Sequence, residues 1–472
     1  MADKFQFNPD APDFIPSFSV AAREANDETA NGTDLEATDE LSAEVSMDSN
    51  ANVLKSLDLS DERIPDEWEV DDEALKEEDV VAPSKSIKKK NTALVPKVRK
   101  EYVNVIFIGH VDAGKSTIGG HLMYLTGQVD KRTLEKYERE AKEMNRESWY
   151  LSWALDTNIE EREKGKTVQV GRANFETAKK HITILDAPGH KSFVPNMIGG
   201  ASQADLAVLV ISARKGEFEA GLERGGQTRE HAVLVKTAGV RHMIVLINKM
   251  DDPTVNWDLK RYNECRDKII PVLKKVGFVP GKDLYFMPCS GQTGALLKDP
   301  VSDDVCPWYS GPTFLEYLDQ LPPISRAREG AVRVVLFDKY NDMGTVVMGK
   351  VESGSVTPVQ VLQLWSDDDE ADEITPGENV KIKLKGIEED AVSSGFVLCS
   401  PDDTCVVGRI FDAQVVIMEH KSIICPGYSA VLHVHAAVEE VSVKVLNSSM
   451  GRFVLRDEGR TVAIGKVLKI IE

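Results

Sequence analysis

Two glycines separated by four residues, with a lysine and a serine directly after the second, form the stretch of this chain best suited to chemistry. The stretch reads Gly109, His110, Val111, Asp112, Ala113, Gly114, Lys115, Ser116 and Thr117. Such a loop wraps phosphate groups with its backbone N–H groups, and a side chain at either glycine would block that approach. We expect Lys115 to contact the β- and γ-phosphates of a nucleotide and Ser116 to bind Mg²⁺.

A second candidate lies at the end of the apolar stretch from His181 to Leu185. It reads Asp186, Ala187, Pro188 and Gly189. The carboxylate could hold Mg²⁺ through water, and the Gly189 N–H could contact the γ-phosphate. Asp-x-Pro-Gly is also common turn chemistry, so the alternative is an ordinary surface turn.

A third motif follows the apolar stretch from Met243 to Ile247 and is suited to selecting a base. It reads Asn248, Lys249, Met250 and Asp251. Asp251 would accept from two adjacent guanine N–H groups that adenine lacks, Asn248 would reach the other edge, and Lys249 would lie over the ring. Because adenine would leave the carboxylate unpaired, the motif indicates GTP or GDP rather than ATP. Ser290 and Gly291 would complete the pocket with a backbone N–H.

Two further residues are assigned roles by their position. Thr167 ends a polar, glycine-containing segment that begins at Arg162, and it is the candidate for a second protein ligand to Mg²⁺ when the γ-phosphate is present. His190 directly follows Gly189 and is the candidate catalytic residue that orients the attacking water. The sequence offers no obvious arginine finger, so we expect slow intrinsic hydrolysis and external activation.

The elements that must position these residues alternate between strand and helix. Apolar stretches begin at Tyr102, His181, Leu206, Met243 and Tyr285, with helical patterns between them. This alternation predicts an α/β fold with a parallel, doubly wound sheet. After residue 331, short alternating segments with glycine turns predict two small β-barrel domains, and strands are expected at 332–337, 344–351, 379–384, 414–418, 430–435, 441–446, 452–455 and 461–470.

Charge divides the chain further. Residues 1–80 hold 24 acidic and 5 basic residues, while residues 81–100 hold 7 basic and no acidic ones. Residues 1–80 are acidic and poor in apolar side chains, so they cannot bury enough apolar surface to fold. We therefore expect a disordered tail. The predicted domains are a tail and basic linker at 1–100, a GTPase domain at 101–323, and two β-barrels at 331–402 and 408–472.

Composition also excludes several classes of protein. The six cysteines form no Cys-x-x-Cys pair, so the sequence predicts neither a zinc site nor a disulfide framework, and we expect reduced thiols in the core. His433 and His435 alternate on one strand without a third ligand type nearby, which argues against a metal site. With no signal-like segment and only strand-sized apolar stretches, the chain is expected to be cytoplasmic, with no membrane partner.

At these motifs the sequence resembles the translational GTPases of the elongation factor family and, among them, the GTP-binding subunits of eukaryotic release factors. The resemblance extends from Tyr102 onward and includes the stretches 151–158, 225–232 and 426–428. Elongation factors usually carry Gly-Ile-Thr where this chain has Gly165-Lys166-Thr167, the form found in the release factor group. The resemblance implies a GTPase that assists a class I release factor on a ribosome stalled at a stop codon.

Two departures from the family and one further resemblance complete the prediction. After 354–356 the family pattern has a further strand and turn, whereas here 361–364 runs almost directly into the acidic segment 366–369. After 441–446 the family has several more strands, whereas here 447–449 is followed at once by 451–453, so both barrels are predicted to be shortened. Residues Phe7 to Pro16 resemble the short peptide that binds the C-terminal domain of poly(A)-binding protein. The alternatives are a ribosome-rescue or elongation-type GTPase, or a truncated, non-productive form that acts only as a binding protein.

Overall fold

The structure is a computed structural model, and it describes most of the chain from residue 100 onward. The described ranges are 100–156, 161–162, 167–222, 226–356, 363–366, 369–371, 373–417, 426–444, 453–457 and 459–471. The predicted acidic tail, its Phe7 to Pro16 motif and the segment 163–166 therefore lie outside the described residues.

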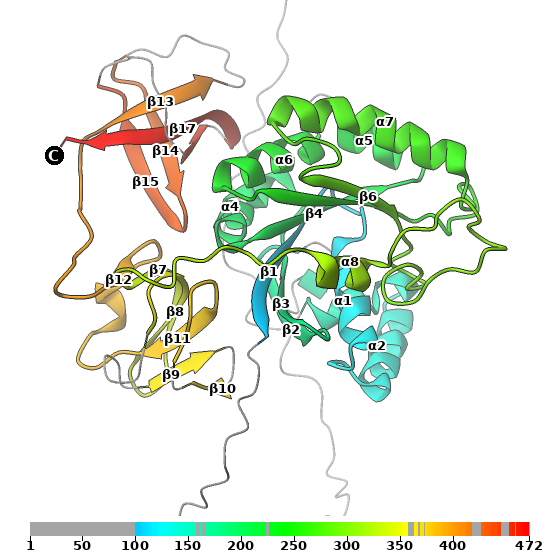
Figure 1. Cartoon of the computed structure of the whole chain (residues 1–472), viewed down its shortest axis with the longest axis horizontal. Helices are drawn as coiled ribbons and strands as arrows, with labels where there is room; N and C mark the ends of the chain where they lie inside the picture. Colours follow the sequence, from blue (N-terminus) through cyan, green and yellow to red (C-terminus); the bar gives the residue numbers. More distant parts are fainter. Residues whose placement is uncertain are drawn as a thin grey trace, which may run out of the picture. The chain divides into compact units, whose positions relative to one another are not determined.

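The first sheet has six strands and carries the predicted motifs at its strand ends (Figure 1). Its strands are β1 (Glu101–Ile108), β2 (Gly171–Glu176), β3 (Lys180–Asp186), β4 (Leu206–Ser212), β5 (His242–Asn248) and β6 (Leu284–Pro288). They lie in the order β2-β3-β1-β4-β5-β6, and every neighbouring pair is parallel except β2 with β3. Because β1, β3, β4, β5 and β6 are parallel, the residues that follow them meet at one edge of the sheet.

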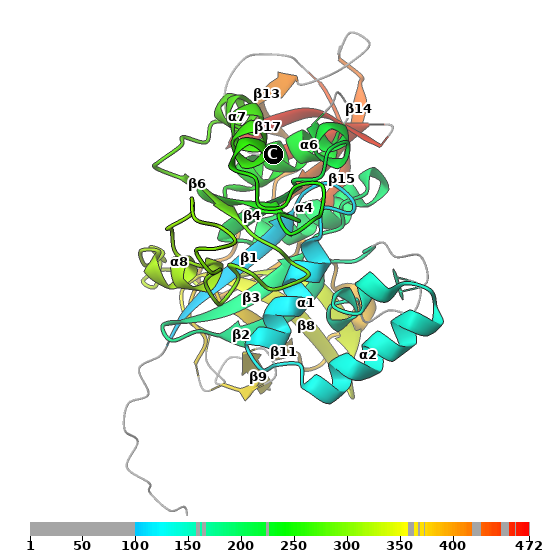
Figure 2. The ribbon, with the colours of Figure 1, turned by 90° about the vertical axis from the view of Figure 1, so that its right-hand side faces the viewer.

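Helices cover both faces of this sheet. The helices are α1 (Lys115–Leu125), α2 (Lys131–Glu143), α4 (Val194–Gln203), α5 (Glu217–Leu222), α6 (Gln227–Ala238), α7 (Leu259–Val276) and α8 (Phe314–Gln320). The helices fall into two groups, each packed on one face of the sheet through a buried apolar cluster. Helices α4, α5, α6 and α7 pack on the face that carries Ile106, while α1 and α8 pack on the face that carries Phe107 (Figure 2). Each face thus has its own core, as a doubly wound sheet requires.

Local sequence explains where several helices begin and end. Asp258 caps α7 by accepting from the Lys260 N–H, and Thr313 with Glu316 forms a capping box on α8. Gly239 and Gly277 end α6 and α7 with φ of 106° and 101°, a left-handed conformation that favours glycine. These residues set the C-terminal ends of α6 and α7 and the N-terminal ends of α7 and α8.

Two antiparallel sheets follow. The strands of the second are β7 (Arg333–Asn341), β8 (Thr345–Ser353), β9 (Gln363–Ser366), β10 (Asp369–Glu370), β11 (Asn379–Lys383) and β12 (Val397–Cys399). The strands of the third are β13 (Phe411–Ile417), β14 (Ser429–Val434), β15 (Ala437–Ser442), β16 (Phe453–Asp457) and β17 (Arg460–Ile470). The sequence predicts two barrels in this part of the chain. The described strand pairings form two sheets instead: the second sheet has β10 and β12 as its edge strands, and the third has β13 and β15.

Two elements differ from the prediction. The first sheet is mixed rather than wholly parallel, because β2 pairs antiparallel with β3 as a hairpin in which only Phe175 of β2 is buried. A strand without an apolar stretch gives no signal in the sequence. The strand predicted at 441–446 begins earlier, at Ala437, because His435 turns the chain with a φ of 51° and β15 carries exposed Glu439 and Glu440.

Ion pairs and hydrogen bonds join the sheets. Asp205, buried before β4, accepts from both Arg326 Nη atoms at 2.7 and 2.6 Å and from Lys350 Nζ of β8 at 3.2 Å. Burial would raise the pKa of Asp205, but these two cations outweigh it and lower that pKa. In α6, Glu230 accepts from Thr461 Oγ1 at 2.7 Å and from Arg456 Nη1 at 3.3 Å.

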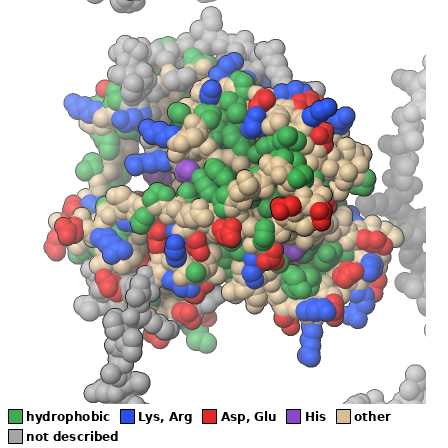
Figure 3. Space-filling view, turned by 45° about the vertical axis from the view of Figure 1, so that its right-hand side comes forward, with side chains coloured by type: hydrophobic (Ala, Val, Ile, Leu, Met, Phe, Trp, Pro, Cys, Tyr) green, Lys and Arg blue, Asp and Glu red, His purple; other side chains and the backbone are tan. Residues whose placement is uncertain are grey.

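The visible surface mixes charges of both signs. Figure 3 shows Lys and Arg side chains interspersed with Asp and Glu, with apolar groups between them. Among the helices that the structure describes, none has the length and apolarity to cross a bilayer.

Candidate nucleotide site

The loop after β1 has the shape that the glycine spacing predicts. Gly109 and Gly114 have φ of 141° and 94°. A Cβ on Gly109 would lie 2.2 Å from the carbonyl oxygen of Val210, and one on Gly114 would lie 2.3 Å from Asn248 Nδ2. Both positions therefore require glycine for conformation and for space. The loop ends at the N-terminus of α1, where free N–H groups favour an anion.

Lys115 is buried inside this loop. Its Nζ donates to the carbonyl oxygens of Gly109 and His110 at 3.2 and 2.9 Å. Burial lowers the pKa of Lys115, while the carboxylates of Asp186, Asp112 and Asp156 oppose that shift. An ammonium group held by carbonyl oxygens in a buried loop is available to exchange them for phosphate oxygens.

Hard oxygen donors gather beside the lysine. Asp186 is fully buried, and neither of its carboxylate oxygens has a well-formed hydrogen bond within the described part of the chain. Burial raises the pKa of Asp186 to about 6 although Lys115 opposes the shift. Ser116 Oγ lies 3.1 Å from Thr167 Oγ1, which donates to Asp156 Oδ1 at 3.3 Å. Unpartnered carboxylate oxygens beside two hydroxyls fit Mg²⁺, which prefers oxygen ligands shared with phosphate.

This arrangement suits an ion completed by a nucleotide rather than a cage of protein ligands. Among the described residues there is no cluster of three or more His, Cys, Asp or Glu side chains that could hold a metal alone. Asp156 belongs to this group of oxygen donors and was not predicted as a site residue. Burial and the neighbouring Asp186 and Glu161 raise the pKa of Asp156 to about 7. The only signal for it was its place in the stretch 151–158.

The base side of the site is built at the ends of β5 and β6. Asp251 lines the cavity and has no hydrogen bond or ion pair to the residues that the structure describes. Lys249 also lines it and donates to Glu217 Oε2 at 2.8 Å. A carboxylate without a protein partner is available to accept from a ligand.

Asn248 is bonded differently from the prediction. Its Nδ2 donates to Ala113 O at 2.8 Å, and its Oδ1 accepts from the Gly291 N–H at 2.8 Å. The Ser290 N–H donates to Ala295 O at 3.2 Å. Ser290 and Gly291 are thus buried behind the cavity with their N–H groups used, and Gln292 is the residue of this loop that lines it. Asn248 fastens this loop to the phosphate loop.

His190 lines the same cavity and opens the turn Lys191–Phe193. Its Nδ1 accepts from the Ser192 N–H at 3.3 Å, and its ring centroid lies 5.8 Å from that of Phe193. Because Nδ1 is an acceptor, the neutral ring carries its proton on Nε2, the atom free to contact a ligand or water. Gly189 lines the same cavity, while Ala187 is buried behind it.

Together these elements surround a cavity of about 640 Å³. It brings together predicted residues from every motif except Ser290 and Gly291: Val111, Asp112, Gly114, Lys115, Ser116, Thr117, Thr167, Gly189, His190, Asn248, Lys249 and Asp251. Arg214, Glu217 and Asp252 also line it and were not predicted. The size and the polar lining fit a nucleotide.

His231, which belongs to none of the predicted motifs, supports the phosphate loop through a hydrogen bond with Gly109. It is fully buried in α6, and its Nδ1 accepts from the Gly109 N–H at 3.2 Å. Burial lowers the pKa of His231 to about 3, and Lys115 and His110 add to the shift. The stretch 225–232 pointed to this helix only through the family resemblance.

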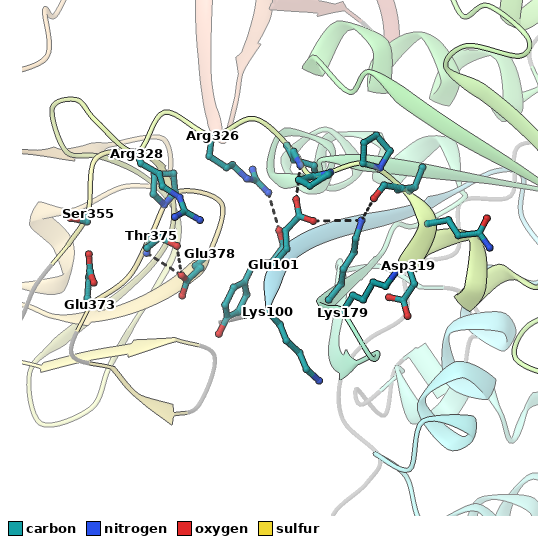
Figure 4. Close-up of a pocket in the computed structure, with 18 residues that line it drawn as sticks. Lys100, Glu101, Lys179, Asp319, Arg326, Arg328, Ser355, Glu373, Thr375 and Glu378 are labelled. Carbon is teal, nitrogen blue, oxygen red and sulfur yellow. Dashed lines mark hydrogen bonds and ion pairs between the residues drawn. The ribbon is translucent and has the colours of Figure 1, made fainter. Parts of the chain in front are cut away.

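A larger cavity of about 1080 Å³ lies elsewhere and does not have the features of this site (Figure 4). Its charged groups are largely bonded to protein: Lys180 Nζ donates to Leu321 O at 2.9 Å, and Thr375 Oγ1 donates to Glu378 Oε1 at 2.6 Å. No phosphate-binding loop opens into it among its described lining residues.

Comparisons with known proteins agree with this geometry. The Elongation factor Tu GTP binding domain matches residues 100–323, and the GTP-eEF1A C-terminal domain-like family matches residues 410–449. The chain is 49% identical over 428 residues to the eukaryotic peptide chain release factor GTP-binding subunit of Kluyveromyces lactis, covering 79% of this chain and 61% of the relative. The chain thus spans about three fifths of that relative's length.

Two solved structures were also similar. A crystal structure of sup35 complexed with GDP is 39% identical, with 81% of this chain and 98% of that chain covered and a TM-score of 0.38. The Ski7 GTPase-like domain of S. cerevisiae, bound to GDP and inorganic phosphate, is 16% identical, with 78% and 98% covered and a TM-score of 0.63. The Ski7 likeness shows the fold alone.

The matched region also bears on the predicted shortening. The alignment extends over 428 positions, which is more residues than 79% of this 472-residue chain contains. Part of the relative within the matched region therefore has no counterpart in this chain. The C-terminal family match ends at residue 449, beside the predicted gap at 447–451. By its 49% identity over 428 residues and the match of residues 100–323, the chain belongs to the family of eukaryotic peptide chain release factor GTP-binding subunits, with a GTP-binding domain of the elongation factor Tu type.

Proposed function

We propose that this chain binds GTP and GDP with Mg²⁺, hydrolyses GTP, and acts in translation termination with a class I release factor on the ribosome. The observation that carries the proposal is the 640 Å³ cavity, which is lined by Lys115 and Asp251 from the loops after β1 and β5. Asp186, at the end of β3, is buried beside Lys115. Family membership supports the choice of termination among the processes that GTPases serve.

The phosphates would lie on the loop from Gly109 to Thr117. Lys115 exchanges its carbonyl partners for β- and γ-phosphate oxygens, and the loop N–H groups surround them. Ser116 and Thr167 would hold Mg²⁺ together with phosphate oxygens, and Asp186 would reach the ion through water, with Asp156 positioning Thr167. Bound Mg²⁺ would neutralise charge on the phosphates.

The base would lie between Lys249 and Asp251. The Asp251 carboxylate accepts the two guanine N–H groups, and Lys249 covers the ring with its aliphatic stem. Asn248, Ser290 and Gly291 would act by holding the two loops in place, and Gln292 would line the pocket. Adenine would leave Asp251 unpaired, so discrimination against ATP follows.

His190 would orient the attacking water through Nε2. Its Nδ1 is held by the Ser192 N–H, so the ring has a fixed tautomer. Ala187 and Pro188 support the turn that carries Gly189 and His190 toward the γ-phosphate. The chain supplies no arginine to this step in our proposal, which makes hydrolysis depend on the ribosome.

The domain boundaries remain those that the sequence predicts: 1–100, 101–323, 331–402 and 408–472. The three sheets fall within the last three of them. In the first, Phe7 to Pro16 would bind poly(A)-binding protein, with Phe7 and Phe14 as anchors. Because its partners are the ribosome and a release factor, we place the chain in the cytoplasm.

A binding experiment tests the proposal. The purified chain loaded with GTP and Mg²⁺ should bind a class I release factor and should bind aminoacyl-tRNA at least about 100-fold more weakly, a gap of roughly 3 kcal/mol. Titration of fluorescent GTP against GDP and ATP in the same preparation measures the nucleotide site separately. Tight aminoacyl-tRNA binding would overturn termination, whereas equal affinity for ATP would overturn the site.

A further inference from the structure

Two cysteines outside the nucleotide site lie close together at the surface of the second sheet. Cys399 ends β12, and Cys405 follows in the connection that leads to β13. Both are half-buried, whereas Cys265, Cys289 and Cys306 are buried at 0%, 0% and 3% exposure. The sequence predicts core thiols throughout, and these two are the exceptions among the described cysteines.

The chain folds back between the two cysteines. The Asp403 N–H donates to Ser400 O at 3.2 Å, which makes a tight turn directly after β12. Arg333 of β7, the cross-strand partner of Cys399, forms an ion pair with Asp403 Oδ1 at 3.1 Å. The turn and the ion pair together bring Cys405 back toward Cys399, and Cys399 is among the groups that raise the pKa of Cys405.

The resting pair is a stable dithiol. Burial raises the pKa of Cys405, and Cys399 and Asp403 add to the shift while Arg333 opposes it. The Cys405 sulfur is therefore mostly protonated at neutral pH. Reaction goes through the small thiolate fraction, which the Arg333 guanidinium favours.

We propose that Cys399 and Cys405 form a modification site, which a hydroperoxide converts to an intramolecular disulfide. The Cys405 thiolate attacks one peroxide oxygen, the O–O bond breaks, and the other oxygen leaves as an alcohol or as water once it takes up the thiol's proton. Cys405 is then a sulfenic acid. The Cys399 thiol attacks its sulfur, the S–O bond breaks, and water leaves with the Cys399 proton. Two thiols are oxidised and one peroxide is reduced.

The bond would tie the first part of the connection back to β12. Residues 400–404 would become a closed loop, so the chain leading to β13 would start from a fixed point. The loop contributes no residue to the nucleotide cavity. Oxidation should therefore protect residues 400–404 from proteases while leaving GTP affinity unchanged.

Mass spectrometry of the full chain tests the proposal. Cys425 lies outside the described residues, so a Cys425→Ser background removes it as a competing partner. Hydrogen peroxide should lower the mass of the peptide that contains both cysteines by about 2 Da, and dithiothreitol should restore it. Cys399→Ser and Cys405→Ser should each abolish that loss, while Cys306→Ser should retain it.

An arsenical tests the proximity without oxidation. Phenylarsine oxide binds two neighbouring thiols with loss of one water, and each single variant should weaken its binding by about 100-fold because only one bond is left. The matched control is again Cys306→Ser, expected to bind like the parent. If the pair peptide keeps its mass while a reduced glutathione control is oxidised, or if the single variants bind the arsenical like the parent, the modification site does not exist.

Discussion

In our proposal Asp251 selects the base, because it lines the cavity and has no hydrogen bond or ion pair to the described residues. Asp251→Asn replaces one acceptor oxygen with a donor, which opposes guanine and suits xanthine. Loss of a hydrogen bond to a charged group is worth about 2–3 kcal/mol, so GTP should bind roughly 100-fold more weakly while xanthosine triphosphate binds more tightly. Fluorescent nucleotide titration measures both.

The control for this change is Asp258→Asn, the same substitution at the cap of α7, which an asparagine also caps. It should leave both affinities unchanged. A parent chain that binds ATP as well as GTP would refute the base assignment before any variant is made.

His190 acts on turnover rather than on binding in our proposal. His190→Ala should leave GTP affinity within about threefold but lower ribosome-stimulated hydrolysis by about 100-fold, because positioning of the water is lost and no phosphate contact is. Ser192→Ala is the matched control, since Ser192 holds the ring through its backbone N–H. Unchanged stimulated turnover in His190→Ala would make His190 a structural residue.

At this scale the sequence predicts motif positions better than it predicts individual bonds. Lys115, Thr167 and Asp251 line one cavity because their spacing from strand ends is set by the fold. Asn248 was expected to face the base, yet its amide bonds two loops. Such bonds depend on residues more than 40 positions away, which no local pattern contains.

At the scale of elements, the buried His231 of helix α6 makes the stability of the fold depend on pH. Its pKa of about 3 lies below the unfolded value of about 6.5, so the unfolded chain binds the extra proton between these values. The contribution of neutral His231 to the free energy of unfolding is fully present above pH 6.5. It is lost as the pH falls toward 3, by about 1.4 kcal/mol per pH unit.

Urea unfolding of the parent and of His231→Asn between pH 7 and 4 measures this effect. Asparagine offers an acceptor to the Gly109 N–H but does not titrate. The parent should therefore lose stability more steeply with acid, by the equivalent of one proton. Parallel curves for the two proteins would show that His231 is not held neutral by the fold.

Elements with a buried apolar face were predictable, and edge elements were not. The stretches that begin at Tyr102, Leu206 and Met243 became β1, β4 and β5, almost entirely buried. β2 and β15 lie at sheet edges with mostly exposed or half-exposed residues, so hydrophobicity gives them no period. Their pairing is set by neighbouring strands.

The whole molecule is uneven in its buried cores. Among the described residues, six apolar side chains form the buried cluster of the third sheet: Ala430, Leu432, Phe453, Leu455, Val462 and Ala463. The GTPase sheet has a large cluster on each face. Since buried apolar area is the main stabilising contribution, the third sheet should open more readily.

Limited proteolysis with peptide mapping checks this. Cuts are expected within about 355–375 and near 447–451 before any within 101–322, together with weaker release-factor binding than a relative with the longer C-terminal half. Equal protease resistance of the third sheet, with tight release-factor binding, would show that the remaining strands make a sound domain.

The central claim is tested most directly by GTP turnover in a reconstituted termination reaction. Ribosomes stalled at a stop codon and a saturating class I release factor are supplied, so that weak affinity does not hide activity. We predict that turnover rises by about 10³-fold or more only when both are present, and that peptide release becomes faster with GTP than with GDP. Turnover unchanged by the ribosome and release factor, with release indifferent to GTP, would contradict the account.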